Sequence, residues 1–202
     1  MSDGRGATAP MAPDLGPEAP SAALDAEILE AFTRGERRRA LACCAREHGA
    51  SIGRLCMAML GSQVDADDMT QETLLSAHQT FVSYRKEGSV RAWLLGIARH
   101  KCLQHLEKNR RRGARLRLVT SFDASPAADE VVAEKKRAER ARDLLEQVRP
   151  SEREALLLRF GAGLSFREVA LSCGIDEPTA RKRVSRALSR LRGVLVKEDE
   201  HE

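Results

Sequence analysis

The helix that is predicted near the C-terminus of the chain carries side chains that can read duplex nucleic acid. Its apolar residues recur at helical spacing and predict one packing stripe: Ala180, Val184, Ala187, Leu188, Leu191 and Leu195. Its other side carries cations and hydroxyls. The residues that we assign to DNA contact are Thr179, Arg181, Lys182, Arg183, Ser185 and Arg186. Arginine and lysine donate to guanine edges and neutralise phosphates, although a solvated basic face would look the same in an isolated helix.

Capping signals upstream of this segment favour DNA binding. Ser165 with Glu168, and Ser151 with Glu154, have capping-box spacing, so each pair predicts a helix start. The helix from Phe166 to about Ser172 is short and ends at a glycine. A short helix, a glycine turn and a longer helix are typical of a helix-turn-helix.

The turn itself contains the residue types that this motif needs. Gly174 follows the short helix, and Ile175 is expected to enter the core. Asp176 can cap the next helix, and Pro178 fits its first turn, where no backbone donor is missed. The agreement of these signals favours a DNA-reading helix over a solvated one.

A second candidate surface lies on the helix expected from about Val90 to Asn109. Leu95, Ala98, Cys102 and Leu106 predict its buried stripe. The opposite side combines an aromatic ring with cations and hydrogen-bonding groups: Trp93, Ile97, His100, Lys101 and Gln104. Unpaired bases stack on aromatic rings beside positive charge, so this side suits single-stranded DNA. Packing of Trp93 and Ile97 under the loop Phe81–Ser89 is the alternative interpretation.

An acidic, amide-bearing helix start interrupts this basic chain. It contains Asp65, Asp67, Asp68, Gln71 and Glu72. Nucleic acid would be repelled there, so a protein partner with a basic surface is the natural complement. Helix capping is the alternative explanation for Asp65 and Asp68.

The five cysteines predict reduced thiols packed in a core. They are Cys43, Cys44, Cys56, Cys102 and Cys173, without C-x-x-C spacing. We find no phosphate loop, no nucleophile with a base, and no metal cluster, and therefore expect no catalytic residue, metal or cofactor. Without a signal peptide or an apolar run long enough to span a bilayer, we expect a cytoplasmic protein with no membrane partner.

Composition predicts an all-α fold of two small helical domains. The 202 residues are 42% hydrophobic but only 3% aromatic, with apolar residues spread among Arg and Glu. We expect a disordered tail (1–22), a helical bundle (23–113), a flexible linker (114–134), a helix-turn-helix domain (135–196) and a frayed tail (197–202). Within the bundle we expect helices through Ile28–Phe32, Leu41–Ala45 and Ile52–Leu60, the last ending at Gly61, and then a helix capped by Asp65. The Arg110–Arg117 run is expected to contact phosphates or to lie near the linker, and a solvated charge run is the alternative interpretation.

These segments resemble a known family over nearly the whole chain. Asp65–Leu75 and Val90–Lys101 resemble region 2 of extracytoplasmic-function (ECF) sigma factors of bacterial RNA polymerase. Pro150–Phe160, Gly163–Ala170 and Thr179–Leu188 resemble region 4. Their order and separation also match.

The resemblance implies a role for each surface. The acidic segment would dock on the beta-prime clamp of core RNA polymerase, and region 4 would meet the beta flap and read the −35 element. The loop residues Ser83, Tyr84 and Arg85 would act with the Trp93–Gln104 helix face to open the −10 element and capture a flipped base. Many relatives are held inactive by an anti-sigma factor. The chain departs from the family at three places: His100 takes the place of the usual Asn, the Tyr84 loop differs from the common one, and Ala180 replaces a usual Val. The first two leave the preferred −10 base open, because an imidazole is bulkier than an amide and can carry charge near neutral pH.

Two rival functions predict different behaviour. A stand-alone helix-turn-helix regulator would bind duplex operator without polymerase, but it leaves the acidic segment unexplained. A nucleic-acid enzyme or RNA-binding accessory protein would need a carboxylate or histidine cluster, whereas the histidines of this chain are scattered.

Overall fold

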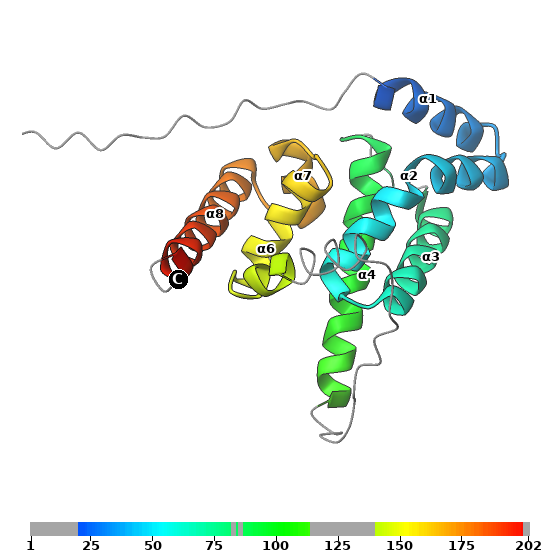
Figure 1. The fold of residues 1–202 in the computed structure, drawn as a ribbon. Helices are drawn as coiled ribbons and strands as arrows, with labels where there is room; N and C mark the ends of the chain where they lie inside the picture. Colours follow the sequence, from blue (N-terminus) through cyan, green and yellow to red (C-terminus); the bar gives the residue numbers. More distant parts are fainter. Residues whose placement is uncertain (1–19, 82–83, 85–86, 114–139, 200–202) are drawn as a thin grey trace, which may run out of the picture.

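The chain folds into packed helices in the computed structural model, which describes residues 20–81, 84, 87–113 and 140–199 (Figure 1). The elements in chain order are α1 (Pro20–Thr33), α2 (Arg37–Leu60), α3 (Gln63–Thr80), α4 (Val90–Gly113), α6 (Pro150–Leu156), the π-helical turn η2 (Leu157–Gly161), α7 (Phe166–Cys173) and α8 (Glu177–Asp199). Residues 140–146 are also helical. The described ranges contain no strand, so the all-α prediction is confirmed there. The predicted linker lies outside them.

The first four helices share one apolar core. Helix α2 packs against α3 and α4, and α1 lies against α2. Ile28, Ile52, Leu94 and Leu95 are fully buried between them. Burying each such side chain contributes about 1.5–3 kcal/mol, which offsets the weak amphipathic character of the individual helices.

Helix α2 is continuous, so the prediction of two separate helices in this stretch is wrong. Gly49 lies inside it, with His48 and Ile52 buried on either side. Burial of these flanking residues outweighs the cost of a mid-helix glycine, about 1 kcal/mol. Gly61 ends the helix in the left-handed conformation, with φ of 75°, as predicted.

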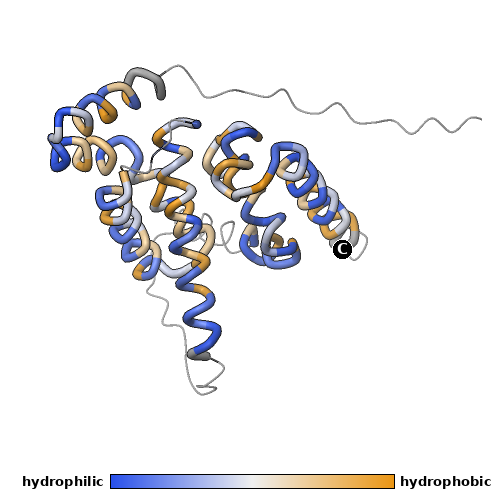
Figure 2. The backbone as a smooth tube through the Cα atoms, turned by 180° about the vertical axis from the view of Figure 1, so that it is seen from behind, coloured by the Kyte–Doolittle hydropathy of each residue, from blue (hydrophilic) through white to orange (hydrophobic). Residues whose placement is uncertain are grey.

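Two details of α3 and α4 differ from prediction. The side chain of Ser62, not Asp65, caps α3, because its oxygen accepts from the Asp65 amide, which lies in the first turn. In α4 the stripe of Leu95, Ala98 and Cys102 is fully buried as predicted, but Leu106 is 41% exposed. The helix runs past the rest of the bundle to Gly113, and this C-terminal part is mostly hydrophilic (Figure 2).

The C-terminal elements form the predicted helix-turn-helix. Both halves of the Ser165–Glu168 capping box are present at the start of α7. Gly174 ends α7 with φ of 65°, a conformation that side chains with a Cβ rarely adopt. Asp176 then accepts from the Thr179 amide at 2.7 Å, as expected for a cap.

Two predictions for this part are wrong. Helix α6 begins at Pro150 after Arg149, without a side-chain cap, so Ser151 and Glu154 form no capping box. The Glu154 carboxylate pairs with Arg99 of α4 instead. Leu195 is 42% exposed because α8 extends beyond the helices that cover its earlier apolar residues.

Among the described helices, none combines the length and apolar character of a membrane-spanning segment.

Candidate nucleic-acid and protein interfaces

The outer face of α8 is convex and rich in donors. Lys182, Ser185, Arg186 and Ser189 are exposed, while Ala180, Val184 and Ala187 are buried on the opposite side. Thr179 and Arg183 are half-buried. Of the predicted residues, Lys182, Ser185 and Arg186 therefore lie together on the exposed side of the helix, and the others are partly covered.

Arg181 is held differently from its neighbours. Its guanidinium pairs with Glu177 at 2.6 Å and lies 4.4 Å from the centre of the Phe166 ring. Arg159 lies 4.9 Å from the same ring, so two guanidinium groups pack against Phe166. These contacts tie the start of α8 to α7 and pre-order Arg181 before any ligand binds.

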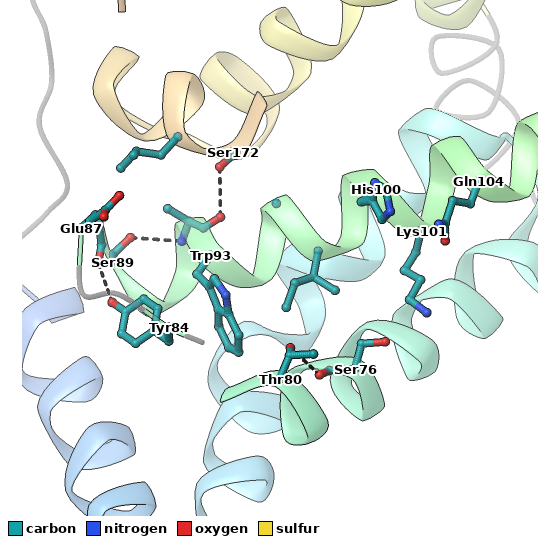
Figure 3. Close-up of a pocket in the computed structure, with 15 residues that line it drawn as sticks. Ser76, Thr80, Tyr84, Glu87, Ser89, Trp93, His100, Lys101, Gln104 and Ser172 are labelled. Atoms are coloured by element: carbon teal, nitrogen blue, oxygen red, sulfur yellow. Dashed lines mark hydrogen bonds between the residues drawn. The ribbon is translucent and has the colours of Figure 1, made fainter. Parts of the chain in front are cut away.

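A cavity of about 600 Å³ lies along α4 and holds most of the predicted −10 residues (Figure 3). Its wall includes Tyr84, Trp93, Ile97, His100, Lys101 and Gln104. Ser83 and Arg85 lie outside the described residues. Helix α3 and the end of α7 complete the wall, the latter through Leu171 and Ser172.

Trp93 both packs and faces this cavity, so the two interpretations offered for it are compatible. Its ring meets Phe81 edge-on, with centroids 5.5 Å apart, and lies 5.3 Å from the Tyr84 ring. Phe32 of α1 also stacks on Phe81. These aromatic contacts thus fix a half-buried indole whose remaining surface lines the cavity.

Tyr84 is fixed by its hydroxyl. The Oη atom donates a hydrogen bond to the Gly88 carbonyl. Burial raises the pKa of Tyr84 to about 12, so the phenol keeps its proton near neutral pH and remains a donor. This bond joins Tyr84 to Gly88, two residues before the start of α4.

Asp25 of α1 is a positioning residue that the sequence analysis missed. Its Oδ2 accepts from the Val90 amide at 2.8 Å and so caps α4 from a distant helix. Burial is the main reason that the pKa of Asp25 lies above its usual value, and the Glu168 carboxylate contributes. No local sequence signal links residues 65 positions apart.

The acidic segment of α3 divides into two parts. Asp65 pairs with His105 at 3.1 Å and Glu72 with Lys101 at 3.2 Å, so both carboxylates point toward α4. Asp67, Asp68 and Gln71 are exposed.

Two apolar residues that the sequence analysis missed extend this exposed part. Val64 is 72% and Leu75 57% exposed, and both lie in line with Asp68 and Gln71 at helical spacing. We call Val64, Asp68, Gln71 and Leu75 the α3 stripe. Its mixture of apolar groups and negative charge suits a protein partner rather than a polyanion.

The cysteines are core residues. Cys43, Cys44, Cys56 and Cys102 are buried and Cys173 is partly exposed, all as free thiols. Burial is the main cause that raises the pKa of Cys44 to about 11, which disfavours the reactive thiolate. Within the described residues, no cluster of three or more metal-binding side chains occurs.

Comparison with known proteins gives the family. Sigma-70 region 2 matches residues 44–112, and Sigma-70 region 4 matches residues 138–191. The chain is 36% identical over 137 residues to the ECF RNA polymerase sigma factor SigC of Mycobacterium tuberculosis, covering 65% of this chain and 70% of that protein. It is 31% identical over 171 residues to SigM of the same species, covering 85% and 84%.

Solved structures agree on the fold. The Bartonella quintana sigma factor RpoE, in complex with the anti-sigma factor NepR, superposes with a TM-score of 0.60 at 24% identity, covering 75% of this chain and 93% of that one. CnrH in complex with the cytosolic domain of CnrY gives a TM-score of 0.63 at 21% identity, covering 88% and 97%.

The chain belongs to the ECF sigma factors of RNA polymerase. It therefore directs promoter-specific transcription initiation, in a family of regulatory DNA-binding proteins rather than enzymes. This function is favoured over the stand-alone helix-turn-helix regulator.

Proposed function

We propose that the chain reads a promoter with two different surfaces while a third holds the polymerase. The exposed face of α8 reads the −35 element as duplex, and the α4 cavity captures an unpaired base of the −10 element. The α3 stripe docks on the beta-prime clamp. The observation that carries this proposal is the coexistence of a convex cationic helix face and a concave aromatic cavity in one chain.

The cavity suits a base that has left the stack. Its volume of about 600 Å³ lies within the 300–1,000 Å³ typical of small-molecule pockets. Trp93 offers a ring face, while His100 and Gln104 offer hydrogen-bonding groups along the exposed edge. Base stacking on an aromatic ring contributes about 1–3 kcal/mol, which helps to offset the energy of strand opening.

The α8 face suits duplex DNA because its cations lie exposed on a convex helix surface, which can enter a groove. Lys182 and Arg186 lie one turn apart, with Ser185 between them. In this arrangement one cation can donate to a base edge while the other neutralises a phosphate. The domain that contains α6, α7 and α8 would also contact the beta flap of the polymerase.

Lys101 and His105 connect the polymerase-facing and DNA-facing helices. The Lys101–Glu72 ion pair and the polar contact between His105 and Asp65 link α3 to α4. We propose that Asp65 and Glu72 act by fixing the orientation of α3 relative to α4. Asp67, Asp68 and Gln71 contact the polymerase. We also propose that residues 23–113 form the polymerase- and −10-binding domain and that residues 135–196 form the −35-binding domain. The same proposal includes a cytoplasmic location, an anti-sigma factor as a partner and no catalytic activity.

Run-off transcription with core polymerase on a pool of genomic promoters tests the proposal. Core polymerase should produce RNA from defined start sites only when the unmodified chain is present. Asp68→Arg with Leu75→Ser should reduce this RNA at least 10-fold, because it reverses a charge and removes apolar area from the α3 stripe.

The matched control is Asp143→Arg with Leu195→Ser, which makes the same chemical changes at exposed positions elsewhere. Loss of RNA in both double variants would show that the α3 stripe has no special role. Absence of start-site-specific RNA from the unmodified chain would contradict the sigma-factor mechanism itself.

A further inference from the structure

Arg181 differs from Lys182 and Arg186 in being held by two contacts. Its Nη2 atom pairs with a carboxylate oxygen of Glu177 at 2.6 Å, and its Nε atom donates to the same oxygen at 3.1 Å. Its guanidinium carbon lies over the Phe166 ring, 4.4 Å from the ring centre. Lys182 and Arg186, by contrast, are exposed. The Arg181 guanidinium therefore has a set orientation before DNA binds.

The Phe166 ring on which Arg181 lies is itself fixed. Phe166 is the first residue of α7, and its side chain is buried. Arg159 of η2 lies 4.9 Å from the ring centre and donates from Nη1 to the Leu164 carbonyl at 2.9 Å. Because the ring is buried and Arg159 is anchored to the backbone, Arg181 packs on a part of the domain core.

The Glu177–Arg181 pair is more than an ordinary helix pair. Its spacing of four residues, with the acid first, is the favourable one for a helix. A pair of this kind on an open surface holds its side chains only loosely, because both stay solvated and mobile. The side chains of Glu177 and Arg181 are only 40% and 33% exposed, and the aromatic ring supports the guanidinium. Together the two contacts fix a direction for the guanidinium as well as neutralising it.

The held arginine lies where a recognition helix reads bases. Helix α8 begins at Glu177, and the N-terminal residues of such a helix contact base edges in the major groove. Pairing with Glu177 uses donors on Nε and Nη2, which leaves both N–H groups of Nη1 and one of Nη2 for a ligand. Two such donors match the O6 and N7 acceptors of guanine. An oriented side chain loses less conformational entropy when it binds one particular base edge.

The Glu177 carboxylate also changes how this end of α8 meets the DNA backbone. Its negative charge opposes the general attraction between cations and phosphates, which is independent of sequence. Pairing with Glu177 further reduces the contribution of Arg181 to that attraction. A group that weakens binding to all sequences, while it orients a donor toward one base, raises specificity.

We propose that Glu177 and Phe166 are positioning residues that make Arg181 a guanine-specific reader within the −35 element. This inference rests on the proposed reading of the −35 element by α8. It predicts that removal of the Glu177 carboxylate changes affinity and specificity in opposite directions. Binding to DNA without a −35 element should rise, while the preference for guanine should fall.

Selection from a promoter pool tests the proposal. Core polymerase with the full chain is bound to promoters that have a randomised −35 element, and the bound DNA is sequenced. For the unmodified chain we expect guanine to be enriched about 10-fold at one position. Glu177→Gln should reduce this enrichment to about 3-fold and raise the affinity for a promoter with a scrambled −35 element about 3-fold. Unchanged enrichment in Glu177→Gln would overturn the proposal.

Two conservative variants separate orientation from charge. Glu177→Asp keeps the carboxylate but shortens its reach, so guanine enrichment should fall while binding to the scrambled promoter stays low. Arg181→Lys keeps the positive charge but removes the planar fork, so guanine enrichment should disappear. Glu146→Gln is the matched control, because it makes the same change as Glu177→Gln at an exposed position outside α8. It should leave both measurements unchanged.

Thermal unfolding of each variant distinguishes positioning from a purely structural role. If Glu177 only stabilised the start of α8, Glu177→Gln would lower the melting temperature and weaken binding to every promoter alike, and the proposal would fail. A preferred base that Arg181→Lys leaves unchanged would also overturn it, while α8 would remain the −35 reader. No preferred base at any −35 position with the unmodified chain would instead contradict the assignment of α8 to the −35 element.

Discussion

The α8 face and the α4 cavity differ in how many parts of the chain build them. The α8 face belongs to one helix, and its contact residues follow from a single apolar period. The cavity needs α3, α4, the end of α7 and the loop residue Tyr84, with α1 supporting the aromatic cluster. A convex surface can be encoded locally, whereas a concave one depends on tertiary packing.

The two surfaces also differ in how far one contact residue can replace another. On α8, Lys182, Ser185 and Arg186 offer several exposed donors side by side, so each can be partly replaced. In the cavity, Trp93 is the one tryptophan of the chain, and its position depends on Phe81 and Tyr84. We therefore expect single substitutions to be more damaging in the cavity than on α8.

The largest expected effect is that of Trp93→Leu. Leucine retains apolar packing against Phe81 and Tyr84 but offers no ring to an unpaired base. Loss of stacking worth about 1–3 kcal/mol predicts about 50-fold weaker capture of a single-stranded −10 oligonucleotide by the polymerase complex. Fluorescence anisotropy of the labelled oligonucleotide measures this.

Trp93→Phe sharpens the test because it keeps an aromatic face with less volume. We expect the phenylalanine variant to bind within about 5-fold of the unmodified chain. Similar defects in both variants, with matching losses of thermal stability, would show that Trp93 serves packing alone.

The features that could be predicted from the sequence are those that depend on local signals rather than on tertiary packing. The capping box at Ser165, the turn at Gly174 and the Asp176 cap are local signals, and the structure confirms them. The Ser151–Glu154 pattern has the same form but forms no cap, because Glu154 pairs with Arg99, 55 residues away. A local motif is reliable only when no distant charge competes for its side chain.

The next largest effect is that of Lys182→Ala with Arg186→Ala. Removing two exposed donors from the α8 face should weaken promoter binding by the polymerase complex about 10-fold, because good base contacts contribute about 1–3 kcal/mol and neighbouring donors compensate in part. The loss should depend on the −35 sequence and should reduce the salt dependence of binding.

Arg149→Ala with Arg167→Ala is the matched control, since it removes the same charge at exposed positions off α8. Anisotropy on promoters with intact and scrambled −35 elements separates the two variants. A uniform loss for both pairs on both promoters would reduce the α8 face to a nonspecific basic surface.

The α3 stripe and the capping of α4 show why the rest was not predictable. In the sequence Val64 and Leu75 look like part of an ordinary helix, and only their exposure reveals a stripe with Asp68. Asp25 has no neighbouring partner in the sequence, yet it caps α4. A single exposed apolar residue carries no signal, and residues of this kind acquire a role only when the fold aligns them.

The smallest expected effect concerns His48, which is buried in α2. Burial, aided by Arg91, lowers the pKa of His48 below its usual 6.5, and its Nε2 atom has no hydrogen-bond partner in the described structure. The unfolded chain therefore binds a proton more readily than the folded one, so stability is lost as pH falls below 6.5. Between pH 7.5 and 5.5 this loss is at most about 1.4 kcal/mol for one histidine.

His48→Met removes the titrating group, so chemical unfolding at both pH values should show a smaller acid-induced loss for the variant than for the unmodified chain. An equal loss in both would mean that groups other than His48 set the acid sensitivity.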